Sequence, residues 1–239
     1  MHRHTQTDTQ ADSKAWDRIQ AVAQGVVPLT DPIAEPGRLY IANRGLGGTL
    51  ADLPDPAVFG FHSGLEYRDD NRRLVGVFPG VVGRVQRLDG ATVCLHRTYL
   101  ATDGRKADVP GSAKKMMPPI YQGATQGSAI RLFPARDVIG VTEGLETAFA
   151  VRLGTKMPVW ATGTAGGMAV LQLPIEIRTV NIWADKDRSG TGQRAAESLA
   201  QRLVKEGRIV RIMTPPGAIP DGSKSLDWLD VWNSQRGQS

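Results

Sequence analysis

From residue 137 onward, short apolar runs alternate with segments whose apolar residues recur at helical spacing. In the clearest of these segments, Ala195, Ala196, Leu199 and Leu203 recur among charged neighbours, which predicts an amphipathic helix. Short apolar runs between helices are typical of buried parallel strands joined by right-handed crossovers. We therefore expect an α/β domain with a parallel sheet, with strands at residues 138–142, 159–161, 180–184 and 209–214 and helices at 145–153, 168–171 and 191–206.

The preceding part of the chain has a different pattern, in which strand-like runs follow one another without intervening helices. Asp89-Gly90 and Thr102-Asp103-Gly104 are typical turn sequences between such runs. This pattern predicts a smaller α+β module with mainly antiparallel strands. The expected strands are residues 58–62, 74–78, 83–88, 92–99 and 130–133, with an extended loop at 114–119.

Polar and proline-rich segments flank these two domains. The first residues are polar and lack apolar periodicity, and the prolines that follow separate two short helical patterns. The expected organisation is a disordered tail at 1–14, a small helical cap at 15–56 with helices at 15–24 and 37–44, the antiparallel module at 57–136, the parallel domain at 137–232 with a last helix at 225–232, and a frayed tail at 233–239.

The composition is that of a globular protein with a hydrophobic core, since 41% of the 239 residues are apolar and 22% are charged. No run approaches the roughly 18 apolar residues of a membrane span, and the first residues have no apolar signal-peptide core. We therefore expect a cytoplasmic protein with no membrane partner. The single cysteine, Cys94, excludes an internal disulfide and a Cys₂ or Cys₄ zinc ribbon, and its strand-like context predicts a core residue.

The net charge of +5 is concentrated in the middle of the chain. Residues 62–136 carry 12 Lys and Arg against 6 Asp and Glu. Because basic side chains that neutralise phosphates supply most non-specific affinity for nucleic acids, this excess favours a polynucleotide-binding track. An ordinary basic surface is the alternative.

Three acidic residues directly follow predicted strands of the parallel domain. Glu143 comes after the first strand, and Asp185 and Asp187 come after the third. In an open parallel sheet, such positions line the ligand crevice. Clustered carboxylates there favour a bound cation, and their hard oxygen atoms suit Mg²⁺. The pattern therefore indicates metal-dependent phosphoryl chemistry; the alternative is that Glu143, Asp187 or Ser189 only caps a helix.

The sequences around these carboxylates resemble a known domain. Glu143-Gly-Leu-Glu-Thr-Ala, Thr162-Gly-Thr-Ala-Gly-Gly and Ala184-Asp-Lys-Asp-Arg-Ser-Gly, each after a predicted strand, look like a Toprim domain. This metal-binding fold is shared by bacterial primases, type IA and II topoisomerases and some nucleases. Leu95-His-Arg-Thr-Tyr-Leu100 and Lys114-Lys-Met116 are similar to the module that precedes it in Toprim proteins of plasmids, phages and integrative elements. The resemblance thus implies a Toprim domain, with a Rossmann-like parallel sheet flanked by helices, behind the basic module.

The resemblance also implies roles for individual residues. Glu143 would be a general acid/base or metal partner, and Asp185 and Asp187 would hold Mg²⁺ or Mn²⁺, with neither zinc nor an organic cofactor. Arg97 and Lys115 look like basic positions near nucleotide and template. Further candidates for contact with nucleic acid or nucleotide are Lys114, Arg131, Lys186 and Arg188, although Lys186 and Arg188 could simply balance charge.

A late acidic segment departs from the family pattern. Asp227 and Asp230 are similar to an Asp-Phe-Asn-Asp motif, but Leu229 replaces its asparagine. Their role therefore stays open.

The leading hypothesis is a DNA primase core, a nucleotidyltransferase that uses nucleoside triphosphates to make short RNA primers on single-stranded DNA. The setting would be replication or transfer of a mobile element, with a replicative helicase, a relaxase or another replication protein as partner. The alternatives are a Toprim metal-dependent nuclease and a non-catalytic replication factor that binds single-stranded DNA.

Overall fold

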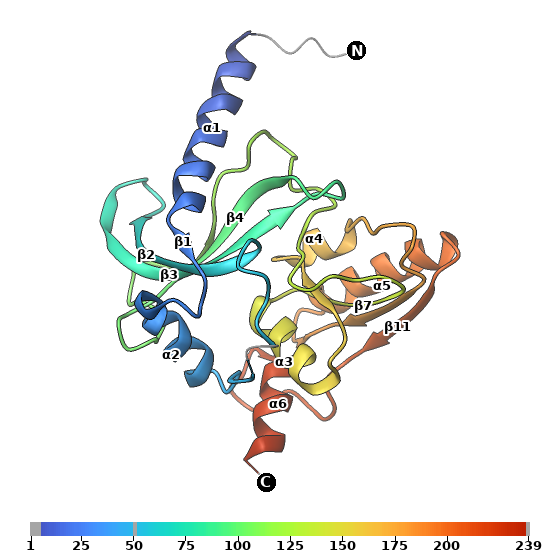
Figure 1. Ribbon diagram of the computed structural model, residues 1–239. Helices are drawn as coiled ribbons and strands as arrows, with labels where there is room; N and C mark the ends of the chain where they lie inside the picture. The colour runs from blue at the N-terminus through green and yellow to red at the C-terminus, as the bar shows by residue number, and fades with distance from the viewer. Residues whose placement is uncertain (1–5, 50–51, 238–239) are drawn as a thin grey trace. The chain divides into compact units, whose positions relative to one another are not determined.

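The structure is a computed structural model that describes residues 6–49 and 52–237, and the chain forms two compact units (Figure 1). The first unit contains the chain up to Gly47 together with Asp55–Gln86 and Gly90–Thr125. The second contains the chain from Gln126 onward and two short earlier segments, 48–54 and 87–89. Most of the expected helical cap at 15–56 therefore groups with the antiparallel module.

The first unit is built on an antiparallel sheet. Its strands lie in the order β1-β2-β3-β4-β5, and every neighbouring pair is antiparallel, as the sequence predicts. Cys94 is fully buried in this sheet, and burial raises the pKa of its thiol to about 11, which confirms a core residue. The elements are α1 Gln6–Gln24, β1 Val26–Val27, η1 Pro32–Ala34, α2 Glu35–Asn43, β2 Phe59–Arg68, β3 Leu74–Gln86, β4 Thr92–Tyr99 and β5 Lys114–Met116.

The two strands expected at 74–78 and 83–88 are one continuous strand, β3. The register of β2 shifts between His62 and Leu65, where the hairpin passes Pro79 and Gly80. A Cβ on Gly80 would lie 2.6 Å from the carbonyl oxygen of Thr98, so only glycine allows β3 and β4 to approach here. The gap expected at residues 79–82 therefore does not occur, because the irregularity in β2 accommodates Pro79 and Gly80 within the sheet.

Helix α1 begins at Gln6, which corrects the expected disordered tail for residues 6–14; residues 1–5 lie outside the described residues. Ala15 and Ile19 are buried and anchor the helix to the first unit. Between Gln6 and Gly25 the sequence contains no glycine or proline, so it allows one continuous helix over this range.

The loop expected at 114–119 contains a strand, since β5 pairs antiparallel with β4. Its three residues are too few to show an alternating pattern, and Pro118-Pro119 follows them directly. The pairing with β4 therefore decides this strand.

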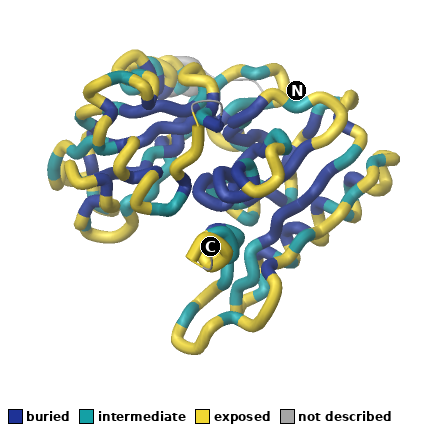
Figure 2. Tube along the Cα trace, turned by 60° about the horizontal axis from the view of Figure 1, so that its bottom comes forward, coloured by how far each residue is buried: buried dark blue, intermediate teal, exposed yellow. Residues whose placement is uncertain are grey.

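The second unit has the expected parallel sheet. Its strand order is β6-β8-β7-β9-β11, in which β8, β7, β9 and β11 are parallel and β6 is antiparallel to β8. Figure 2 colours most of the central strand residues as buried. The elements are β6 Ala129–Ile130, β7 Val138–Thr142, α3 Leu145–Thr155, β8 Val159–Ala161, α4 Ala165–Ala169, β9 Thr179–Trp183, β10 Lys186–Asp187, α5 Thr191–Lys205, β11 Ile209–Met213, β12 Ser225–Leu226 and α6 Trp228–Arg236.

The strand order changes direction at β7. The chain passes from β7 to β8 on one side and then crosses to β9 on the other side of β7. In an open α/β sheet, the crevice outside the carboxyl ends of strands at such a switch point is the usual ligand site. Here it lies where β7 and β9 end.

The end of the chain differs from the expected helix at 225–232. Residues Ser225 and Leu226 form β12, which pairs with β10, and α6 then runs from Trp228 to Arg236. Residues 233–236, expected to fray, are therefore helical, while 238–239 lie outside the described residues. Asp227 caps the helix, and its buried residue Leu229 anchors it.

None of the helices in the described residues is long and apolar enough to cross a membrane.

The buried face of α5 should carry much of the stability of the second unit. Leu203 is fully buried, while its neighbour Val204 is 57% exposed. We expect Leu203→Ala to lower the free energy of unfolding by about 2–5 kcal/mol, and Val204→Ala by less than about 0.5 kcal/mol, in urea denaturation followed by circular dichroism. Equal losses for the two variants would contradict the packing of α5.

Candidate active site

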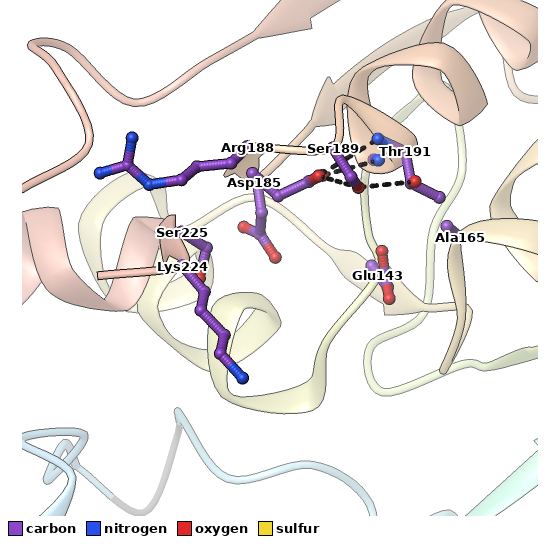
Figure 3. Close-up of a pocket in the computed structure, with 10 residues that line it drawn as sticks. Glu143, Ala165, Asp185, Arg188, Ser189, Thr191, Lys224 and Ser225 are labelled. Atoms are coloured by element: carbon purple, nitrogen blue, oxygen red, sulfur yellow. Dashed lines mark hydrogen bonds between the residues drawn. The ribbon is translucent and has the colours of Figure 1, made fainter. Parts of the chain in front are cut away.

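Glu143 and Asp185 come from neighbouring strands of the parallel sheet. Glu143 follows the last residue of β7 and Asp185 lies two residues after the end of β9, on the two strands that meet at the switch point. They line a cavity of about 530 Å³, here called the acidic cavity (Figure 3). Its lining residues are Glu143, Ala165, Asp185, Asp187, Arg188, Ser189, Thr191, Gly192, Lys224 and Ser225.

Asp187 is held at the start of α5. Its carboxylate accepts hydrogen bonds from the backbone N–H groups of Thr191, at 3.2 Å, and Gly192, at 2.9 Å, and from the hydroxyl of Ser189. Although partial burial opposes ionisation, these bonds lower the pKa of Asp187 below its ordinary value. Asp187 therefore does cap the helix, as the alternative interpretation states, and it presents an ionised carboxylate to the cavity.

Asp185 has the opposite electrostatic environment. Burial, followed by the negative charges of Asp227 and Glu143, raises its pKa to about 7. The Trp228 backbone N–H and the Thr147 hydroxyl donate hydrogen bonds to this carboxyl group, but its Oδ1 atom is buried without a hydrogen-bond partner. A buried acceptor without a partner is costly, so a ligand that bound this oxygen would remove that cost.

Glu143 faces the N-terminus of α4 rather than capping α3. Helix α3 begins after Gly144 without a side-chain cap. Burial, together with the charge of Asp187, raises the pKa of Glu143, and the Ala165 N–H donates a hydrogen bond that partly opposes this rise. The capping interpretation therefore does not hold for Glu143 on α3.

The donor chemistry of these carboxylates fits a hard cation. Asp185 and Glu143 repel each other, and Asp185 has an unpaired buried oxygen, so a positive ion would relieve both costs. Within residues 6–49 and 52–237, however, no three carboxylate, imidazole or thiolate side chains already converge as an ion-binding group. Mg²⁺ commonly binds through one or two carboxylates and keeps several waters, which matches separated donors of this kind.

Asp227 is the neighbour that the sequence did not assign. Its negative charge helps to raise the pKa of Asp185, and burial raises its own pKa. Asp227 and Asp230 form a reciprocal capping box, in which each carboxylate accepts the other's backbone N–H, at 2.9 and 3.0 Å. Two acidic residues three positions apart have the spacing of a capping box. This spacing could have predicted the start of α6 from the sequence. Leu229, in place of asparagine, is buried in the core.

Lys186 and Arg188 are engaged by backbone carbonyl groups. The Lys186 ammonium donates to the Gly217 oxygen at 2.6 Å, and the Arg188 guanidinium donates to Ser223 at 2.9 Å and Pro220 at 3.3 Å. Arg188 nevertheless lines the acidic cavity. Both side chains therefore hold the loop that leads to β12.

Arg97 and Lys115 line a second cavity, of about 360 Å³, within the first unit; we call it the basic pocket. The Arg97 guanidinium lies 5.3 Å from the centre of the Tyr99 ring, its Nε is buried without a hydrogen-bond partner, and burial lowers its pKa. The Lys115 ammonium donates to the Arg68 carbonyl at 2.9 Å and lies 3.4 Å from Asp70. Because Arg97 is largely buried and has no carboxylate partner in the part of the chain that the structure describes, its charge favours binding of an anion.

The remaining basic candidates lie elsewhere. Alternation along β5 places Lys114 on the face opposite Lys115. Arg131 belongs to the second unit, where its guanidinium lies 4.4 Å from the centre of the Trp160 ring and donates to the Leu88 carbonyl at 3.3 Å. The structure thus gathers Glu143, Asp185, Asp187 and Arg188 in one cavity and Arg97 and Lys115 in another.

Family models match both units of the chain. Residues 13–127 match a domain of unknown function, DUF7146, and residues 138–238 match the Toprim domain. No curated protein matches significantly. The second unit therefore carries a Toprim domain, which confirms the resemblance inferred from the three sequence motifs.

Solved structures extend this likeness to nearly the whole chain. A DnaG primase catalytic domain bound to ssDNA has a TM-score of 0.57 at 18% identity, over 97% of this chain and 79% of that one. A DNA primase domain from Pseudomonas aeruginosa gives 0.58 at 19%, over 92% and 75%. The RNA polymerase domain of Mycobacterium tuberculosis DnaG, in complex with double-stranded DNA, gives 0.53 at 15%, over 98% and 80%. The protein therefore has the Toprim primase fold, as predicted.

Replacing Asp185 should reveal the cost of burying its charge. The pKa of Asp185 is about 7 in the folded protein, whereas its ordinary value is 3.8. Above pH 7 the carboxylate is ionised in both the folded and the unfolded chain, so the full cost of burying its charge lowers the free energy of unfolding. As the pH falls, the folded protein keeps a proton that the unfolded chain releases, so stability rises until both are protonated. In EDTA, Asp185→Asn should raise the free energy of unfolding at pH 8 by up to about 4 kcal/mol, with the gain vanishing by about pH 4.

Urea denaturation across this pH range measures the effect. Asp221→Asn serves as the control, because Asp221 is an exposed carboxylate of the same unit. A gain for Asp185→Asn that does not change with pH would contradict the assignment.

Proposed function

We propose that this protein is a DNA primase core that makes short RNA primers on single-stranded DNA. The observation that carries the proposal is the acidic cavity, which lies at the switch point of a Toprim domain in a chain with the fold of primase catalytic domains. Carboxylates at this place suit phosphoryl transfer, because a metal ion that they bind can neutralise the charge of a triphosphate.

Asp185, Asp187 and Glu143 would hold Mg²⁺ or Mn²⁺. The unpaired Oδ1 of Asp185 supports a direct metal ligand, and Asp187 supplies a carboxylate that its hydrogen bonds keep ionised. Burial and the charge of Asp187 raise the pKa of Glu143 above its ordinary value, which favours a role in proton exchange. The bound metal would offset the charge of the triphosphate and of the leaving pyrophosphate.

The basic pocket would bind the single-stranded template. Arg97 offers a guanidinium that has no carboxylate partner among the described residues, and the buried Tyr99 ring packs beside it. Phosphate contacts from basic side chains supply most of the affinity for single strands that does not depend on sequence. The DnaG primase catalytic domain with the same fold is bound to ssDNA.

The biological setting stays a prediction from the sequence motifs. It comprises action in the cytoplasm, replication or transfer of a mobile element, and partnership with a helicase, a relaxase or another replication protein.

Primer synthesis tests the central proposal. On single-stranded DNA with ribonucleotides and Mg²⁺, the protein should make short RNA that disappears with EDTA. Asp185→Asn and Glu143→Gln should each reduce the rate at least about 100-fold, because each removes a group that acts on the transferred phosphate; denaturing gels of labelled product measure this. Asp221→Asn should leave the rate unchanged.

Two other outcomes would overturn this proposal. Metal-dependent cleavage of the DNA without added nucleotides would favour a Toprim nuclease. Binding of single strands with no product under any condition, and no effect of EDTA on binding, would favour a non-catalytic replication factor.

Template binding can be measured separately from catalysis. Arg97→Gln should weaken binding of a labelled single-stranded oligonucleotide by roughly tenfold and reduce the slope of log K against log salt by about 1, because one phosphate contact is lost. Arg105→Gln is the matched control, since Arg105 is exposed in the same unit. Fluorescence anisotropy at several salt concentrations gives both values; an equal loss for both variants would contradict a specific role for Arg97.

A further inference from the structure

A small hairpin joins the loop before α6 to the carboxylates of the acidic cavity. In its β10–β12 ladder, Asp187 lies opposite Ser225 and Lys186 opposite Leu226. The Arg188 backbone N–H also donates to the carbonyl of Lys224, at 3.2 Å. This pairing fixes Lys224 and Ser225 beside Asp187, although about forty residues separate them in the sequence.

Two basic side chains of the hairpin, Lys186 and Arg188, are already engaged in hydrogen bonds that stabilise it. Lys186 donates to Gly217, and the guanidinium of Arg188 donates to Pro220 and Ser223. The loop that carries Lys224 is thus held at both ends. A side chain on a backbone held in this way loses less freedom when it binds a ligand than one on a free loop.

Lys224 is a third cation of the hairpin, and its ammonium group has no partner among the described residues. It lines the acidic cavity and is exposed. Figure 3 shows Lys224 on the side of the cavity that also carries Asp185 and Arg188, with Glu143 and Ala165 on the other side. Although three carboxylates line this cavity, the ammonium forms an ion pair with none of those described.

This arrangement matches a ligand that contains both a divalent cation and phosphates. The carboxylates of the cavity would bind the divalent cation. The same carboxylates would repel the phosphates that are bound to this cation. A nucleoside triphosphate retains negative charge when it binds one divalent ion, so its outer phosphates need a further positive group beyond the metal. No described residue engages the ammonium of Lys224, which leaves it for that role, whereas Arg188 is engaged by two carbonyl groups.

We propose that Lys224 is a phosphate-binding residue of this site, which contacts the outer phosphates of a metal-bound nucleoside triphosphate. This inference rests on the proposed function, in that the acidic cavity receives the incoming nucleotide. The β10–β12 hairpin then serves as a support that aligns a phosphate contact with the metal ligand Asp187.

Direct binding of Mg²⁺-ATP to the full chain tests the inference without requiring primer synthesis. Isothermal titration calorimetry should show that Lys224→Gln raises the dissociation constant about 10- to 100-fold, as expected for loss of a charge-assisted hydrogen bond. Lys224→Arg should restore most of the affinity. Mg²⁺-tripolyphosphate should show the same loss for Lys224→Gln, because the contact involves phosphate and not the base.

Lys205→Gln is the matched control, since Lys205 is an exposed lysine at the end of α5 in the same unit. Equal affinity of Lys224→Gln and the unsubstituted protein, or no binding of either magnesium complex by the unsubstituted protein, would overturn the inference. Nucleotide binding that depends on Lys224 in a protein that makes no primers would leave the inference standing and refute the proposed function.

Discussion

The parallel pairing of β7 with β9 is the constraint on which the acidic cavity depends. Thr142 pairs with Trp183, so both strands end at the same edge of the sheet, and the residues that follow them meet there. The connection after β7 leads to β8 on one side and the connection after β9 leads away on the other, so the two diverge and a crevice forms between them. Glu143 and Asp185 are therefore brought together by topology, although forty-one positions separate them.

Bringing these carboxylates together has a local electrostatic cost, which the structure distributes unevenly. Asp187 has several hydrogen-bond donors and a lowered pKa, whereas Asp185 has a raised pKa and one oxygen without a donor. The two carboxylates differ because Asp185 is buried beside the charges of Asp227 and Glu143, whereas α5 supplies free N–H groups to Asp187. In the first unit, the guanidinium of Arg97 is largely buried and pairs with no carboxylate of residues 6–49 and 52–237. Each unit therefore contains an incompletely neutralised group, of opposite sign, as expected of sites that bind a cation and a polyanion.

The late acidic segment and the strand directly before it have two structural roles. The capping box of Asp227 and Asp230 fixes the start of α6, while β12, directly before it, aligns Lys224 and Ser225 with Asp187. Leu229 anchors this segment to the core at the position where the related motif has a polar residue. Asp227 consequently affects Asp185 through its charge, and its hydrogen bonds are made to α6 itself.

The sequence alone determined the central strands, since 138–142 and 159–161 coincide with β7 and β8, and it identified Glu143, Asp185 and Asp187 as one group. Those features are encoded locally, by runs of apolar residues and by the residues directly after them. Tertiary structure decided what depends on distant partners: β5 forms because β4 lies beside it, β3 is continuous because β2 shifts its register, and β12 forms because β10 is its neighbour. Tertiary structure likewise decided that, among the described residues, the ammonium of Lys224 and the Oδ1 atom of Asp185 have no hydrogen-bond partner, because this depends on which groups the fold brings within hydrogen-bonding distance.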